Sequence, residues 1–407
     1  MKHCLTILFS LILFTIFFMG GAGCTQKEPA DSVQIRFVAW RPNQPEVWKE
    51  IIFHDLLTQK LKNKSKDVDV FFMDVIWPPE FAAAGWAMEL DDIFDSMERD
   101  AFLPRTILAN TYQGRIYGVP LFIDAGLLYY RKDLLEKYGF QPPQTWDELI
   151  LQAQKIVSGE RKAGYDIVGY TAQFKQYEGL VCDMMEFILS NKGEIVDANG
   201  KSLIADSKAI EAVRFVRDEI IGKIASQGVL SYQEPESLDL FMQGHAVFMR
   251  NWPYAWSHAN DLEKSRVAGK VGIAKLPHFK GGESYSTLGG WQLGISKYSE
   301  NKNEAWKFIK FLTSARIQKL YAIKAGKAPT RKALYADRDV IKYNPHFKDM
   351  KDVFLTAYPR PRSPLYPSIS NVLQRYFSRV ISDPESDIES EAVQASIEIE
   401  KVISLVQ

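Results

Sequence analysis

From residue 33 onward, short apolar runs alternate with longer segments in which apolar side chains recur every three or four positions. Runs rich in β-branched and aromatic residues predict strands at residues 33–40, 68–77, 246–249, 270–276 and 287–296. The helical spacing predicts helices from residue 46 and at 132–139, 207–221, 235–244 and 302–314, and the capping box of Thr145 and Glu148 predicts another. We therefore expect an α/β protein with mostly parallel sheets.

The stretch from Gly118 to Arg131 is a further predicted strand, and it contains one carboxylate, Asp124. Taking a charged group out of water without a partner is costly. Two interpretations follow. Either Asp124 pairs with a neighbouring donor, or it faces a cleft that a polar ligand fills.

The first 23 residues have the layout of a secretory leader. A short basic start precedes an almost wholly apolar run from Cys4 to Met19, which is short for a membrane span of about 20 residues. The small residues before Cys24 resemble a bacterial lipobox, with Gly21 where that box usually has leucine. We expect residues 1–23 to be a lipoprotein signal peptide, Cys24 to carry the lipid, and residues 24–32 to form a tether.

The 407 residues are too many for one compact core and predict two domains or one two-lobed domain. The 50 basic and 50 acidic residues leave no net charge, so the composition does not indicate nucleic acid or an anionic membrane surface as a partner. If Cys4 leaves with the leader and Cys24 carries lipid, Cys182 is the one free cysteine that remains, so the mature chain can form no internal disulfide. The apolar helical pattern around Cys182 predicts a buried small side chain rather than a nucleophile.

Several kinds of chemistry lack their motifs here. The sequence has no phosphate-binding glycine loop, nucleophile elbow or zinc-protease helix, and its six histidines are scattered without ligand spacing. What recurs is an aromatic side chain beside a polar one at a predicted strand end, as at Trp40, Asp74, Trp252 and Trp291. A sugar packs its C–H face on such a ring, and each hydrogen bond from its hydroxyls to a charged group contributes ~1.5–3 kcal/mol.

Other roles are open for some of these residues. Asp74 could equally cap a helix or pair at a sheet edge, while Arg250 and Arg360 are as often salt-bridge partners as ligand donors. Four tryptophans lie within or beside helical patterns and are expected in the core: Trp48, Trp86, Trp146 and Trp306.

Six segments, taken in order, resemble one family: residues 69–77, 122–134, 176–183, 250–256, 288–291 and 360–367. The segments are specific in combination, and any one of them alone would be a weak signal. Together they resemble the extracellular solute-binding proteins of ABC sugar importers, particularly the trehalose/maltose-binding branch. The resemblance extends from Trp40 to the C-terminus.

The resemblance implies a type II periplasmic-binding-protein fold, in which two α/β lobes joined by strand crossings close on a sugar by hinge motion. The N-terminal lobe would be residues 33–127 and 286–328, and the C-terminal lobe residues 128–285 and 329–407. Phe122 to Leu128 would be the first crossing. The positions that match the family's sugar contacts are Asp74, Asp124, Trp252, Tyr254, Gly290, Trp291 and Arg360, with Tyr177 as a further candidate. Phe122 stands where close relatives can carry tyrosine.

One departure from the family lies between Ile52 and Asp55. Relatives have there the end of a helix, a strand and a turn into the next helix, whereas here one helical pattern continues directly. We therefore predict that the first lobe lacks one strand, together with a segment that contributes a ligand contact in relatives. Either an internal deletion or an error in the gene model would produce this departure.

The resemblance implies a substrate-binding lipoprotein that captures a disaccharide such as trehalose or maltose in the cleft between the lobes and delivers it to an ABC permease. We expect a monomer in the cell envelope, held by its lipid and facing the periplasm or exterior. We expect no catalytic residue, cofactor, metal or nucleic acid. Two other functions remain open: a glycoside hydrolase with Asp74 and Asp124 as its paired carboxylates, and an envelope scaffold lipoprotein that has lost binding.

Overall fold

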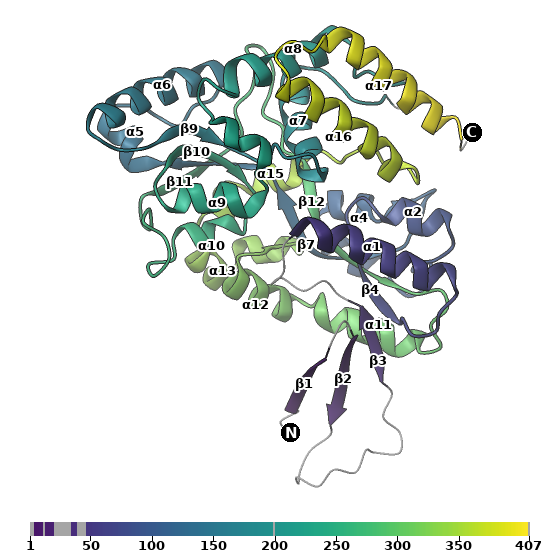
Figure 1. The fold of residues 1–407 in the computed structure, drawn as a ribbon. Coiled ribbons are helices and arrows are strands. Elements are labelled where there is room, and N and C mark those ends of the chain that lie inside the picture. The colour runs from purple at the N-terminus through teal and green to yellow at the C-terminus, as the bar shows by residue number, and fades with distance from the viewer. Residues whose placement is uncertain (1–3, 11–12, 20–33, 39–45, 198–199, 406–407) are drawn as a thin grey trace. The chain divides into compact units, whose positions relative to one another are not determined.

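The computed structural model describes residues 4–10, 13–19, 34–38, 46–197 and 200–405 (Figure 1). Trp40, Cys24 and the predicted tether lie outside these ranges. The chain divides into two compact units, Met1–Phe122 with Gly290–Gln318, and Ile123–Gly289 with Lys319–Gln407. The sequence places these divisions at residues 127/128, 285/286 and 328/329, so residues 123–127, 286–289 and 319–328 belong to the second unit rather than the first.

A seven-stranded sheet has the strand order β1-β2-β3-β4-β12-β7-β13. Its strands are β1 (Cys4–Ser10), β2 (Leu13–Met19), β3 (Ile35–Val38), β4 (Val70–Asp74), β7 (Val119–Ala125), β12 (Leu288–Ile295) and β13 (Ala328–Pro329). The predicted leader thus contains β1 and β2, and β2 pairs antiparallel with β3. Strands β7 and β12 each contain a boundary between the two units.

The core of the first unit lies on both faces of β4. Alternate side chains of a strand point to opposite faces. Val70 and Phe72 accordingly pack with Phe308 and Ile309 of α11 (Lys302–Leu312), while Phe71 and Met73 pack with the cluster that includes α1 (Glu46–Lys62). The remaining elements of the unit are α2 (Pro78–Ala83), α3 (Ser96–Asp100), α4 (Pro104–Ala109), β5 (Thr111–Tyr112) and β6 (Arg115–Ile116), and α12 (Ala315–Ala325) continues into the second unit.

Helix α1 runs without a break through Ile52 and Asp55. Residues 46–69 contain no strand, and β3 pairs directly with β4 in parallel. This agrees with the prediction that the first unit lacks one strand.

The second unit contains a four-stranded sheet of order β11-β8-β10-β9. These strands are β8 (Leu127–Arg131), β9 (Val168–Thr171), β10 (Ala246–Asn251) and β11 (Val271–Ala274). Its helices before β11 are α5 (Lys132–Tyr138), α6 (Trp146–Lys162), α7 (Glu178–Ser190), α8 (Ser207–Phe215) with a π-turn at Val216–Ile220, a 3₁₀ turn at Gln227–Ser231, α9 (Glu234–Met242) and α10 (Ala255–Ala259). After β13 follow a 3₁₀ turn at Lys332–Ala336, α13 (Arg338–Tyr343), α14 (His346–Asp349), α15 (Lys351–Thr356), α16 (Tyr366–Ser382) and α17 (Ile388–Ile403).

Helix α7 is the centre of the second unit's core. Every residue from Gly179 to Ser190 is buried, including Cys182, and α16 packs against the helix (Figure 1). Burial raises the pKa of the Cys182 thiol well above its usual value, so this thiol is not activated as a nucleophile. The sequence prediction of a buried small side chain is confirmed.

The prediction of mostly parallel sheets is wrong. Strands β4 and β12 pair antiparallel, as do β8 with β10 and β8 with β11, whereas β3 with β4 and β9 with β10 are parallel. The alternation of strands and helices indicates parallel neighbours only for strands that follow one another. Here β12 enters the sheet beside β4 from a segment more than 200 residues later in the chain.

Candidate functional site

In the first unit, Asp74 and Trp291 lie opposite each other on neighbouring strands. Asp74 ends β4, and the antiparallel register pairs it with Trp291 of β12. Directly opposed residues of such a pair project from the same face of the sheet. The carbonyl of Gly290 accepts a hydrogen bond from Val75 N at 3.0 Å, so the strand carrying Trp291 is fixed to the end of β4.

Gly290 has a φ of +120°, a conformation that residues with a side chain rarely adopt. Trp291 is only partly buried and lies edge to face with Trp77, with ring centroids 5.6 Å apart. Asp74 is 8% exposed, and its Oδ1 accepts a hydrogen bond from Ile76 N at 3.2 Å. Asp74 therefore has a local turn-stabilising role in addition to its position beside Trp291.

In the second unit, Asp124 lies near the end of β7 and is 8% exposed. Among the described residues, no hydrogen-bond donor reaches its buried Oδ1. Burial raises the pKa of this carboxyl, although the charges of Lys327 and Arg250 act in the opposite direction.

Three contacts fix the position of Trp252, which comes directly after β10. Its ring lies over the guanidinium of Arg250, with 3.9 Å from Cζ to the ring centroid, and its Nε1 donates to Glu234 Oε1 at 3.0 Å. Its carbonyl accepts from the Tyr129 hydroxyl at 2.8 Å. A Cβ added at Gly289 would lie 3.1 Å from Asp124 Cβ and 3.2 Å from Trp252 Cζ3. Asp124 and Trp252 are thus neighbours across the backbone of Gly289.

Beneath Trp252 lies a fully buried ion network. Arg250 donates to both oxygens of Glu186 at 2.8 and 2.7 Å, and its Nε lies 3.0 Å from Asp183 Oδ1. These three side chains are 1–2% exposed. Arg250 is therefore a salt-bridge partner, the structural role that the sequence left open for it.

The remaining predicted site residues also lie in the second unit. Lys327 Nζ lies 5.0 Å from the ring centroid of Tyr254. Arg360 donates to Glu178 Oε1 at 2.6 Å with only 4% of its side chain exposed. Burial, with a further contribution from the neighbouring charge of Glu234, raises the pKa of the Tyr177 hydroxyl well above its usual value.

Within the first unit, the structure brings together Asp74, Gly290 and Trp291, and within the second it brings Asp124 next to Trp252. Arg360 forms the salt bridge with Glu178 that the sequence left open as one of its roles. Sequence reasoning missed Glu234 and Lys327. The signal available for Glu234 was its position before Pro235 at the start of a predicted helix, and nothing in the sequence connected it with Trp252, 18 residues away.

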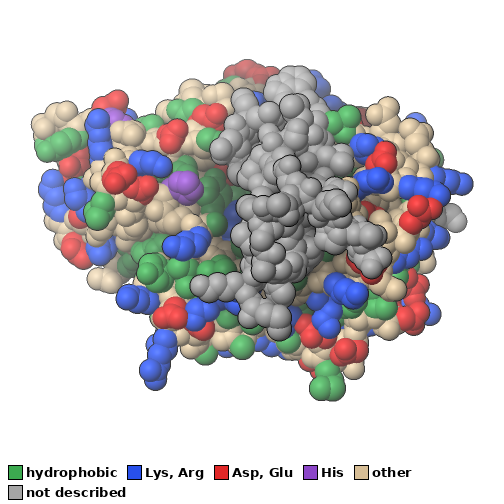
Figure 2. Space-filling model, turned by 90° about the horizontal axis from the view of Figure 1, so that it is seen from below, with side chains coloured by type: hydrophobic (Ala, Val, Ile, Leu, Met, Phe, Trp, Pro, Cys, Tyr) green, Lys and Arg blue, Asp and Glu red, His purple; other side chains and the backbone are tan. Residues whose placement is uncertain are grey.

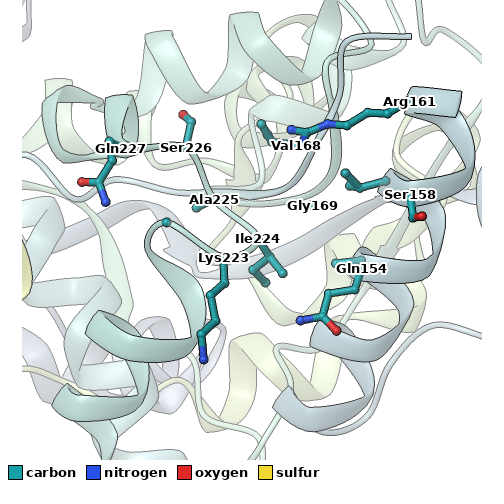
Figure 3. A pocket seen from close by; sticks show the side chains of 13 residues that line it. Gln154, Ser158, Arg161, Val168, Gly169, Lys223, Ile224, Ala225, Ser226 and Gln227 are labelled. Carbon is teal, nitrogen blue, oxygen red and sulfur yellow. The ribbon is translucent and has the colours of Figure 1, made fainter. Parts of the chain in front are cut away.

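A pocket of about 410 Å³ lies elsewhere in the second unit. Figure 3 shows Ser158 and Arg161 projecting from α6 on one side of it and Lys223 on the other. Arg161 donates to the carbonyl of Ile167, and Lys223 pairs with Glu219. None of the predicted site residues lines this pocket.

Figure 2 shows acidic and basic side chains interspersed over the face that it draws, in keeping with the balanced charge of the sequence. Within the described ranges, no three histidine, cysteine, aspartate or glutamate side chains are grouped so that they could hold a metal ion.

None of the helices in the described part of the chain has the length and apolar character that a membrane span requires.

Residues 53–319 match the family model described as bacterial extracellular solute-binding protein. The chain belongs to this family. The match begins at residue 53, within the stretch from Ile52 to Asp55 where the strand is predicted to be missing. Because the family consists of solute-binding proteins and not of enzymes, the glycoside hydrolase alternative loses its support, and this solute-binding protein is not an enzyme.

Relatives extend the comparison. Over 329 residues, this solute-binding protein is 42% identical to a probable ABC transporter-binding protein of Deinococcus radiodurans, covering 80% of this chain and 77% of the relative. The fold matches that of maltose-bound MalE3 of T. maritima with a TM-score of 0.79 and 44% identity, over 87% of this chain and 88% of that one. A Thermotoga lettingae solute-binding protein with bound α-D-tagatose has a TM-score of 0.77 and 26% identity, over 87% and 89% of the two chains. The two-lobed α/β fold class predicted from the sequence is confirmed.

Proposed function

We propose that this protein captures a disaccharide, of which maltose and trehalose are the leading candidates, and delivers it to an ABC permease. In this proposal Asp74, Trp291, Asp124 and Trp252 contact the sugar. The related MalE3 was solved with maltose bound, which supports this class of ligand.

The observation that carries the proposal is the repeated pairing of a carboxylate with a partly exposed tryptophan. Asp74 faces the same side as Trp291, and Asp124 adjoins Trp252. Each ring offers an apolar face to the C–H side of a sugar, and each carboxylate offers acceptors for its hydroxyls. The buried Asp124 Oδ1 supports the proposal because a bound hydroxyl would supply the donor that it lacks.

Titration calorimetry with maltose, trehalose and sucrose tests the proposal, with a panel of amino acids as the competing ligand class. Amino acids belong in the test because a relative from Sinorhizobium fredii, 27% identical over 57% of this chain, is named a probable amino-acid ABC transporter periplasmic-binding protein. A sugar at 100 times its Kd should raise the free energy of unfolding by about 2.7 kcal/mol. The absence of both heat and a melting shift with every carbohydrate would refute the proposal.

We further propose that residues 1–23 are removed and that Cys24 anchors the mature monomer to the cell envelope through a lipid. The apolar leader and the small residues before Cys24 support this. Metabolic labelling with a radioactive fatty acid in a bacterial host should mark the wild-type chain and leave Cys24→Ser unlabelled. Equal labelling of the two chains would contradict the lipid anchor.

A further inference from the structure

Glu234 is the first residue of α9, and several local interactions fix the start of that helix. Pro235 follows it, and proline is favoured in the first helical turn because it fixes φ and lacks an N–H that would need a partner there. The backbone N–H of Gln233 donates to Glu236 Oε2 at 2.9 Å, and this bond is part of a capping box. The carbonyl of Glu234 accepts from Ser237 Oγ at 3.1 Å. The backbone that carries Glu234 is therefore held in place.

The side chain of Glu234 contacts Trp252, one of the proposed sugar contacts. Its Oε1 accepts a hydrogen bond from the indole N–H of Trp252 at 3.0 Å. The guanidinium of Arg250 packs on the face of the same ring. Burial is the main cause that raises the pKa of Asp124, and the negative charge of Glu234 adds to it, so the two carboxylates are near each other. Since Asp124 adjoins Trp252 across Gly289, the ring has a carboxylate near it from two different elements, α9 and β7.

The hydrogen-bonding capacity of Glu234 is only partly used. The indole of Trp252 donates a hydrogen bond to Oε1 of this carboxylate, the hydroxyl of the buried Tyr177 lies beside it, and Glu234 is partly accessible to solvent. An ionised carboxylate has about four acceptor positions on its two oxygens. The remaining positions are available to hydroxyl groups of a molecule that stacks on Trp252.

We propose that Glu234 is a second hydroxyl acceptor in the site and makes binding selective for sugars with a hydroxyl at the edge of the ring that stacks on Trp252. This inference rests on the proposed sugar-binding function. Glu234 then has two tasks: it orients the indole through Oε1 and accepts a ligand hydroxyl through the rest of its carboxylate. Together with Asp124, it provides acceptors from two elements around one stacked sugar ring.

The test compares Glu234→Gln with wild type, using maltose and its singly deoxygenated derivatives in calorimetry. Glutamine keeps an oxygen for the Trp252 N–H but removes the charge, so binding of maltose should weaken about 5- to 10-fold, the difference between a charged and a neutral hydrogen bond. For the derivative that lacks the hydroxyl bound by Glu234, the two proteins should bind with nearly equal affinity. Asp239→Asn is the matched control, because Asp239 is an exposed carboxylate on the same helix, and its affinities should equal those of wild type.

The outcomes separate this inference from the proposed function. If wild type binds no sugar, the proposed function fails and the inference with it. If wild type binds and Glu234→Gln changes no affinity, or weakens every derivative by the same factor, Glu234 only positions Trp252 and the inference alone is refuted. Should Glu234→Gln fail to fold, Glu234→Asp replaces it, and the same loss of discrimination against one derivative is required.

Discussion

The buried network beneath Trp252 gives the sharpest prediction for stability. Replacing Arg250 with methionine removes a guanidinium that lies 2.7–3.0 Å from oxygens of Glu186 and Asp183. All three side chains are at most 2% exposed, so water cannot solvate the two carboxylates that remain. Removing one partner from a buried ion pair typically costs about 3–5 kcal/mol, because the charge left behind is uncompensated.

The assay is thermal and denaturant unfolding followed by far-UV circular dichroism. For a unit the size of the second one, each kcal/mol shifts Tm by roughly 2–4 °C, so Arg250→Met should melt roughly 6–20 °C below wild type. The triple variant Asp183→Asn, Glu186→Gln, Arg250→Met removes the charges together and should recover much of this loss.

Two results would refute this reasoning. One is an Arg250→Met protein that melts within about 2 °C of wild type. The other is a triple variant no more stable than Arg250→Met, which would indicate that the loss comes from packing beneath Trp252 rather than from stranded charge.

Three further predictions concern single side chains. Asp124→Ala should weaken sugar binding roughly 10- to 150-fold. The Tm without ligand should stay at or above that of wild type, because the change removes a buried acceptor that has no donor at Oδ1. Unchanged affinity in calorimetry would show that Asp124 has only a structural role. Gly290→Ala should lower the free energy of unfolding by about 1–3 kcal/mol, since φ is +120° there, and an unaltered urea midpoint would contradict this. Burial lowers the pKa of His346 to about 3, so below pH 6.5 the unfolded state binds a proton that the folded state does not. Stability should therefore fall by about 2 kcal/mol between pH 7 and pH 5, a loss absent in His346→Phe; parallel pH curves for the two proteins would refute it.

Local structure was largely predictable from the sequence, because it depends on neighbouring residues. Both hydrogen bonds of the predicted capping box at Thr145 and Glu148 are present. The predicted strands near residues 70, 248 and 290 are found as β4, β10 and β12. Strand direction was mispredicted because the antiparallel partners come from distant segments whose pairing leaves no local pattern.

The stretch from Gly118 to Arg131, which the sequence predicts as one strand, is two strands separated at Gly126. A Cβ at Gly126 would overlap the carboxylate of Glu186, so the backbone passes directly against the buried network there. No sequence periodicity reveals such a close approach.

The site was predictable where it coincides with a recognisable motif and not elsewhere. Asp124, Trp252 and Trp291 stand in segments that resemble a family, and the structure places each beside another predicted residue. Glu234 of α9 binds Trp252 directly, although 18 residues separate the two in the sequence. Glu186 of α7 supports Trp252 through Arg250, from which it is separated by 64 residues. Such partners are chosen by the fold and cannot be paired from one sequence.

The position of Glu186 has a mechanical consequence. The chain passes between its two units at residues 122/123, 289/290 and 318/319. Glu186 lies against Gly126, just after the first passage, and accepts a hydrogen bond from Thr287 N at 3.0 Å, just before the second. One buried carboxylate on α7 thus contacts two of the three connecting segments. A displacement of one of these segments is therefore coupled, through Glu186, to the other.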